Sequence, residues 1–167
     1  KIGIVGAGFG ARVIAPAFRL DDRCRIEAIA GSSEKKTATT AESLGITRHF
    51  GDWRELVNSA DVDAVAIALP PAMQPQVAVA ALHEGKAVFC EKVENFFNLV
   101  DKKKIILPKF DCFAYGFPCN DFSNVGEHLG FKGKFGPLYY YGVELINRYH
   151  PKWFVAENVG GIKSSNE

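Results

Sequence analysis

Residues 2–11, Ile-Gly-Ile-Val-Gly-Ala-Gly-Phe-Gly-Ala, place a short apolar segment directly before three closely spaced glycines. Gly6 permits a tight turn from a strand into a helix, and Gly8 lets a pyrophosphate approach the backbone. Ala11 holds the third small position of the pattern, where helix and strand pack closely. A glycine turn that binds no ligand could have the same residue pattern, but the flanking strand and helix favour a dinucleotide site. Its predicted contacts are Gly6, Gly8, Phe9, Gly10 and Ala11.

Strand-like and helix-like segments alternate after this turn. The predicted strands are residues 2–5, 26–30, 49–50, 62–69 and 87–90, and the predicted helices are residues 9–20, 34–44, 53–60 and 74–84. Pro16 is expected to kink the first helix, and Gly45 and Gly85 are expected to end two of the others. This alternation predicts βαβ units and a doubly wound parallel sheet of the Rossmann type.

Ligands of such sheets bind at the carboxyl ends of the strands. The residues expected at that edge, besides the glycine turn, are Ser32, Ser33, Leu69, Pro70, Pro71, Glu91 and Lys92.

The pattern is weaker after residue 93. A sixth strand is expected within 105–107 or 111–115, helices at 94–104 and 121–130, and a long strand at 138–145. Glycine and proline cluster at 116–119, which suggests a domain boundary. We therefore predict a nucleotide-binding domain over residues 1–116 and an incomplete second α+β domain over residues 117–167.

Composition narrows the classes of partner. The 167 residues carry a net charge of +1, which favours neither nucleic acid nor an anionic membrane surface as partner. No apolar run reaches the roughly 18 residues of a membrane span. Four cysteines lack metal-ligand spacing, so no metal site is expected, and free thiols indicate the cytoplasm or another reducing compartment. An organelle would fit if the N-terminus, which lacks a methionine, is processed.

The segment after the second strand bears on the choice of cofactor. An acidic side chain there would bind the ribose 2′-hydroxyl of NAD. The sequence instead has Ser32 and Ser33, followed by Lys35 and Lys36, and these groups suit the 2′-phosphate of NADP. NADP is therefore favoured over NAD. The alternative is that a serine only caps the next helix and that the lysines face solvent.

Four stretches together resemble the Gfo/Idh/MocA oxidoreductases, the glucose–fructose oxidoreductase and inositol dehydrogenase group. They are IGIVGAGFGA at 2–11, HFGDWRELV at 49–57, VDAVAIALPP at 62–71 and ALHEGKAVFCEKV at 81–93. Two later segments, FGPLYYYGVEL at 135–145 and HPKWFVAENVGG at 150–161, are similar to the start of that family's second domain and to the approach to its catalytic segment.

The resemblance implies a nicotinamide cofactor along the glycine turn, with Pro70 and Pro71 beside its riboses. It also implies that Lys92 is catalytic, because Lys92 matches the lysine of the family's Glu-Lys-Pro motif, close to the nicotinamide and the substrate hydroxyl. A cationic donor there would hydrogen-bond the reacting oxygen.

The sequence departs from the family pattern at several positions. Val93 replaces the proline of Glu-Lys-Pro, and Gln74 stands where many members have histidine. The Asp and His that the family would place after Gly160 and Gly161 are absent.

Two hypotheses follow. The first is an NADP-dependent oxidoreductase that acts on the hydroxyl or carbonyl of a sugar, polyol or similar small molecule. The alternative is a non-catalytic relative that serves as a structural or interaction subunit of a larger protein assembly.

Overall fold

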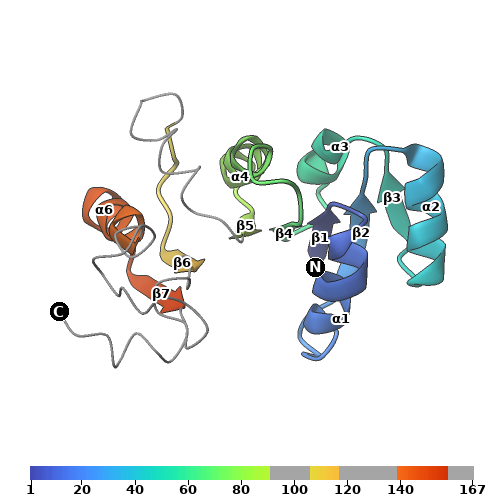
Figure 1. Ribbon diagram of the computed structural model, residues 1–167, viewed down its shortest axis with the longest axis horizontal. Helices are drawn as coiled ribbons and strands as arrows, with labels where there is room; N and C mark the ends of the chain where they lie inside the picture. The colour runs from blue at the N-terminus through green and yellow to red at the C-terminus, as the bar shows by residue number, and fades with distance from the viewer. Residues whose placement is uncertain (91–105, 117–138, 158–167) are drawn as a thin grey trace, which may run out of the picture. The chain divides into compact units, whose positions relative to one another are not determined.

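The computed structural model describes residues 1–90, 106–116 and 139–157 (Figure 1). The chain divides into two compact units. Unit 1 comprises Lys1–Glu91 with Ile105–Pro108, and unit 2 comprises Lys92–Lys104 with Lys109–Glu167. The boundary that the sequence suggests after residue 116 stays a prediction.

Unit 1 is built on a five-stranded parallel sheet. Its strands are β1 (Ile2–Val5), β2 (Ile26–Ala30), β3 (Arg48–Phe50), β4 (Ala64–Ile67) and β5 (Ala87–Cys90), in the order β3-β2-β1-β4-β5. The chain runs outward from β1 to β3 and then returns to continue on the other side of β1. This confirms the predicted doubly wound sheet and places the change of direction between β1 and β4.

The central strands form the core of unit 1. All four residues of β1 are buried, as are Ile29 of β2 and Val65 and Ile67 of β4. Strands buried on both faces have nearly continuous apolar sequences, interrupted here only by Glu27 of β2, and this pattern predicts the three strands.

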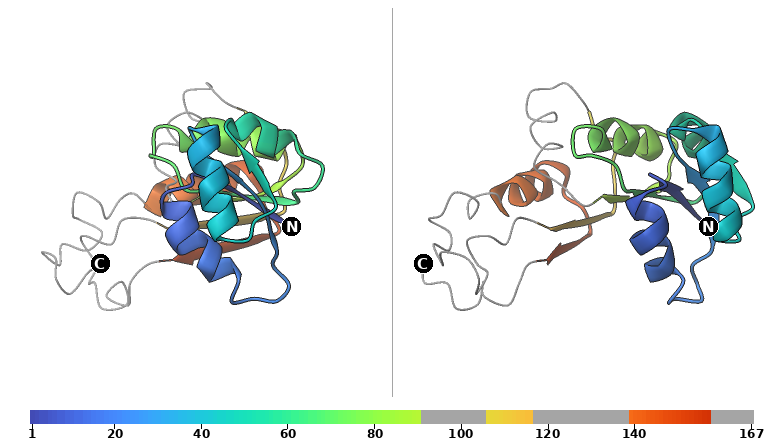
Figure 2. Two further views of the ribbon diagram at one scale, coloured as in Figure 1. Left: turned by 90° about the vertical axis from the view of Figure 1, so that its right-hand side faces the viewer. Right: turned by 45° about the vertical axis from the view of Figure 1, so that its right-hand side comes forward.

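Helices cover both faces of this sheet. They are η1 (Gly10–Ile14, a π-helical turn), α1 (Ala15–Phe18), α2 (Glu34–Ser43), α3 (Trp53–Asn58) and α4 (Gln74–His83). Figure 2 shows α3 and α4 on one face and α1 on the other. Pro16 lies at the start of α1, where proline is tolerated. The irregular part of this helix is instead the π-helical turn η1, which precedes the proline.

Local sequence signals explain where the helices begin and end. The Ser33 and Asp52 side chains cap α2 and α3, and Asp52 Oδ1 accepts the backbone N–H of Arg54 at 2.9 Å. Gly45 and Gly85 follow α2 and α4 with φ of +62° and +71°, as the predicted glycine ends require.

Unit 2 contains a β-α-β arrangement. The strands β6 (Cys112–Gly116) and β7 (Trp153–Glu157) pair in parallel, and α6 (Tyr139–Tyr149) lies between them in the chain. Aromatic rings line this unit: Phe113 stacks on Tyr115 at 5.1 Å between centroids, and Phe110 lies 5.4 Å from Tyr149. The second of the two positions proposed for a sixth strand is thus confirmed. The helices predicted at 94–104 and 121–130 lie outside the described residues.

The strand predicted at 138–145 is wrong, because this segment begins α6. Gly142 and Leu145, three residues apart, are the buried positions of the helix. In a window of eight residues rich in tyrosine, alternation and helical spacing are hard to distinguish. The helical period becomes visible only when the segment is followed to Tyr149.

Within the described residues, the helices are too short or too polar to cross a membrane.

Candidate dinucleotide site at the carboxyl edge of the sheet

The turn after β1 is fitted closely to the neighbouring strands. Gly6 has a φ of +114°, and its N–H donates to the Ala30 carbonyl at 2.8 Å. A Cβ at this position would stand 2.3 Å from the carbonyl oxygen of Ala68, the residue after β4. Both the backbone angle and the space therefore require glycine.

Gly8 and Gly10 have different surroundings. A Cβ on Gly8 would meet nothing within 4 Å, so its backbone is open to an approaching ligand. A Cβ on Gly10 would stand 2.5 Å from Cγ2 of Ile4, so Gly10 allows the helix to pack on β1. Ala11 is buried, whereas Phe9 is about half exposed. The glycine turn thus combines one open position with two packing positions.

The segment after β2 also holds the backbone in a defined conformation. Gly31 donates its N–H to the Phe50 carbonyl at 3.1 Å, and a Cβ on Gly31 would stand 2.4 Å from Thr37 Oγ1. The buried Thr37 hydroxyl donates to the Ser33 carbonyl at 2.7 Å. Thr37 is not among the predicted site residues, although a threonine four residues after a helix cap is a recognisable signal for this bond.

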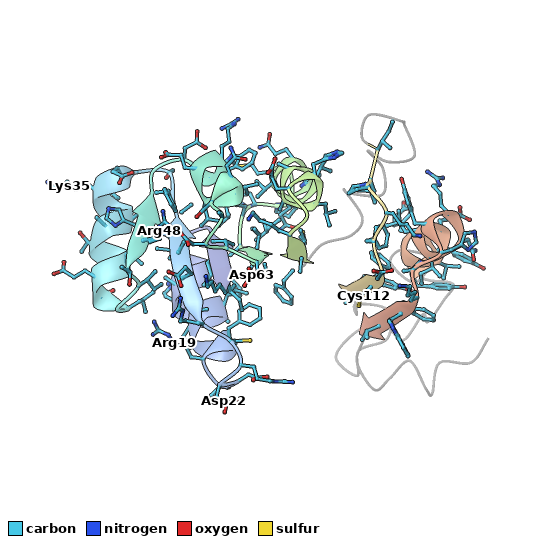
Figure 3. The ribbon with its side chains drawn as sticks, turned by 180° about the vertical axis from the view of Figure 1, so that it is seen from behind. Arg19, Asp22, Lys35, Arg48, Asp63 and Cys112 are labelled. Carbon is cyan, nitrogen blue, oxygen red and sulfur yellow. The ribbon has the colours of Figure 1, made fainter. Side chains whose placement is uncertain are left out.

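Ser33 Oγ accepts the backbone N–H of Lys36 at 3.5 Å, so this serine does serve as the helix cap. Ser32, Lys35 and Lys36 are exposed, and Lys35 projects outward from α2 (Figure 3). Glu34, the first acidic residue after β2, pairs with His49 at 3.3 Å. The segment after β2 therefore presents hydroxyl and ammonium groups, and its first acidic side chain lies beside His49.

Polar contacts connect the carboxyl ends of β1, β4 and β5. Ala68 donates its N–H to the Val5 carbonyl at 2.8 Å, and Gln74 Nε2 donates to the Leu69 carbonyl at 2.8 Å. The Cys90 thiol donates to Gln74 Oε1 at 3.2 Å. Leu69 is half-buried and Pro70 is exposed, whereas Glu91 and Lys92 lie outside the described residues.

Because the five strands are parallel, the segments that follow them lie along one edge of the sheet. The structure brings the glycine turn, Ser32 with Ser33, and Leu69 with Pro70 to this edge. An open glycine backbone beside a change of strand order fits a pyrophosphate-containing ligand. No cluster of His, Cys, Asp or Glu suited to a metal ion occurs in the described part of the chain.

A cavity of about 300 Å³ lies elsewhere, around the start of β2. Two arginines line it, but Arg25 pairs with Glu27 at 2.5 Å and Arg19 donates to the Leu44 carbonyl. Since β2 begins at Ile26, this cavity is at the amino edge of the sheet. It is therefore separate from the dinucleotide site.

The fold and the glycine turn define unit 1 as a nucleotide-binding Rossmann domain, and comparison with known proteins specifies the family. The model of the oxidoreductase family with an NAD-binding Rossmann fold matches residues 1–92. The chain therefore belongs, over these residues, to the Gfo/Idh/MocA family of oxidoreductases, whose members bind a nicotinamide cofactor.

Individual relatives support this assignment. Glucose-fructose oxidoreductase domain-containing protein 2 from mouse is 36% identical over 91 residues, which is 54% of this chain and 23% of that protein. The crystal structure of an NAD-binding oxidoreductase from Klebsiella pneumoniae aligns with a TM-score of 0.54 and 34% identity, covering 60% of this chain and 30% of that one.

The second half of the chain matches another family, and the two matches overlap at residues 82–92. Residues 82–167 fit the model of C-5 cytosine-specific DNA methylases. The Type II methyltransferase M.BbvI from Brevibacillus brevis is 59% identical over 59 residues, covering 35% of this chain and 16% of that protein. The chain thus joins parts of two families, and it spans less than a quarter of the length of these curated relatives.

This second match corrects the interpretation of the segments 135–145 and 150–161. Both lie within the region that fits the methylase model, whereas the oxidoreductase model ends at residue 92. The helix α6, found where a strand of an oxidoreductase second domain was expected, agrees with this correction.

Proposed function

We propose that unit 1 binds NADP at the carboxyl edge of its sheet and serves an oxidoreductase that acts on a hydroxyl or carbonyl of a sugar, polyol or similar small molecule. The observation that carries the proposal is the open backbone at Gly8, in a turn whose neighbouring glycines are fixed by packing. Gly6, Gly8, Phe9, Gly10 and Ala11 would hold the pyrophosphate, with Leu69, Pro70 and Glu91 along the rest of the cofactor.

The preference for NADP rests on the groups after β2. The Ser32 hydroxyl and the Lys36 ammonium are exposed and can both donate to a phosphate. Ser33 Oγ accepts the Lys36 N–H with a lone pair, so its own O–H can still donate. A 2′-phosphate at this position would therefore find several donors.

The bound cofactor supplies a hydride acceptor or donor. The residue proposed to act on the substrate is Lys92, whose ammonium would donate a hydrogen bond to the reacting oxygen and stabilise charge on it as the proton moves. Lys92→Ala is expected to abolish turnover with little change in cofactor affinity. Unchanged turnover would remove Lys92 from the site.

Cofactor titration of the full chain tests the binding proposal. Nicotinamide fluorescence should show tighter binding of NADPH than of NADH. Lys36→Gln should weaken NADPH binding about tenfold, the effect of losing one charge-assisted contact, and leave NADH unchanged. Lys109→Gln removes an equally exposed ammonium from unit 2 and should change neither affinity. Absence of binding would overturn the cofactor proposal, whereas equal affinities would overturn only the preference for NADP.

The non-catalytic alternative makes a different prediction. A structural or interaction subunit that keeps the Rossmann domain could bind NADPH but would turn over no sugar or polyol. Turnover that depends on Lys92 would exclude it.

A second candidate function applies to residues 82–167. The 59% identity to M.BbvI favours a role in C-5 cytosine-specific DNA methylation, although the near-neutral net charge offers no support for DNA binding. Incubation of the full chain with duplex DNA and a radiolabelled methyl donor tests this role. Label in DNA cytosine would support it, and the absence of both label and a DNA mobility shift would reject it.

A further inference from the structure

The side chain of Gln74 connects the carboxyl ends of β4 and β5. It is 3% exposed, and its Nε2 donates to the carbonyl of Leu69, two residues beyond β4. Its Oε1 accepts the thiol of Cys90, the last residue of β5, at 3.2 Å. Ile67 and Cys90 are register partners in the pairing of β4 with β5. The Gln74 side chain therefore links the carboxyl ends of these two neighbouring strands by hydrogen bonds.

An amide is suited to this position because it donates and accepts at the same time. The partner on the β4 side is a carbonyl, which needs a donor, and the partner on the β5 side is a thiol, which is donating. Asparagine carries the same two groups on a side chain one methylene shorter. It is therefore expected to satisfy one partner but not both.

The residues that Gln74 contacts are adjacent in sequence to residues proposed to bind the cofactor or the substrate. Pro70 follows Leu69 directly, and Glu91 and Lys92 follow Cys90. We propose that Gln74 is a positioning residue for the nicotinamide side of the dinucleotide site, acting through the Leu69 carbonyl and the Cys90 side chain. This inference rests on the proposed function of unit 1.

The opposite end of the same two strands provides a control. Lys86, just before β5, donates from Nζ to the carbonyls of Ser59 at 2.8 Å and Val62 at 2.6 Å, both preceding β4. This contact ties β4 to β5 at the amino edge, away from the proposed site. Loss of the Lys86 contacts should lower the stability of unit 1 without changing its affinity for the cofactor.

The experiment compares two ligands on the full chain: NADPH, and adenosine 2′,5′-bisphosphate, which lacks the nicotinamide half. Gln74→Asn should weaken NADPH binding about tenfold, the scale of one misplaced hydrogen-bonding group, and leave the bisphosphate affinity within about twofold. Gln74→His, whose neutral ring has one donor and one acceptor, should recover most of the NADPH affinity. Lys86→Met should lower the unfolding midpoint and change neither affinity.

These measurements distinguish the proposed role of Gln74 from the proposed binding of NADP by unit 1. Equal weakening of both ligands by Gln74→Asn would show a general structural role and overturn the inference, as would unchanged NADPH affinity. Wild-type protein that binds neither ligand would overturn the proposed function, and the inference with it. If Gln74→Asn does not fold, failure of Gln74→His to bind NADPH like the wild type would also overturn the inference.

Discussion

Gly6 lies directly against the carbonyl group of Ala68, so that the turn after β1 is fitted to the end of β4. Gly6 and Ala68 directly follow β1 and β4, the two strands between which the chain changes direction. The glycine turn is therefore packed against the sheet at Gly6 and Gly10 and open at Gly8. This arrangement separates residues that shape the turn from residues that leave room for a cofactor.

Gly6→Ala should destabilise unit 1 and abolish cofactor binding. The new Cβ would meet the Ala68 carbonyl, and a φ of +114° is strained for an L residue, so a cost of about 1–3 kcal/mol is expected. Chemical denaturation and NADPH titration measure the two effects. A variant with wild-type stability would show that the turn can relax away from β4.

Gly8→Ala should leave stability almost unchanged but weaken cofactor binding. Its Cβ would meet no protein atom within 4 Å, so stability should change by less than about 0.5 kcal/mol. The same Cβ would stand where the pyrophosphate is proposed to approach, and NADPH affinity should fall at least tenfold. Full cofactor affinity in this variant would move the phosphates away from Gly8.

Sequence predicted unit 1 well because local and global signals agree there. Ile4 lies in a run without polar side chains, Ile29 lies in a run interrupted only by Glu27, and Gly45 and Gly85 mark helix ends that the structure confirms. The hydrogen bonds of the Gln74 side chain could not be predicted, because its partners Leu69 and Cys90 become neighbours only when β4 and β5 pair.

Thr37→Val should cost about 1 kcal/mol of unfolding free energy, the usual effect of losing one buried hydrogen bond. The threonine is 1% exposed and donates to the Ser33 carbonyl, which retains the Thr37 backbone N–H at 2.9 Å. Thr39→Val is the matched control, since the Thr39 hydroxyl makes the same contact with Lys35 but is exposed. Equal effects of the two substitutions on denaturation would contradict a special role for burial.

The strand predicted at the start of α6 in unit 2 is wrong for a different reason. Tyr139, Tyr140 and Tyr141 taken alone are compatible with a strand, and the helical spacing of the buried Gly142 and Leu145 appears only over the whole of α6. Gly142 lies against the ring of Tyr115, which is 24 residues before the helix in the chain. Long-range packing of this kind overrides local propensity.

Asp52→Asn should reduce the dependence of stability on pH. The backbone N–H of Arg54, and secondly its guanidinium, hold the pKa of Asp52 below its usual value of 3.8. The ionised carboxylate therefore stabilises the folded state above about pH 3.8, and this contribution is lost as the pH falls through the lower, folded-state pKa.

Thermal unfolding between pH 7 and pH 2.5 measures this effect. Asparagine also caps helices but does not titrate, so the wild type should exceed the variant at neutral pH and converge with it in acid. Asp22→Asn removes a carboxylate from an exposed turn and reports the general effect of losing one charge. A constant difference between wild type and Asp52→Asn across the range would contradict the prediction.

Gly142→Ala should destabilise unit 2 and leave cofactor binding by unit 1 unchanged. A Cβ on Gly142 would stand 2.1 Å from ring atoms of Tyr115, so α6 or the ring must move, at a cost of about 1–3 kcal/mol. Tyr115→Leu in the same chain should recover part of this cost, because the shorter side chain leaves room for the methyl group. Near-ultraviolet circular dichroism of the tyrosines follows unit 2, and NADPH titration follows unit 1. An equal loss of cofactor affinity would mean that the two units fold as one, since every described residue proposed to contact the cofactor belongs to unit 1.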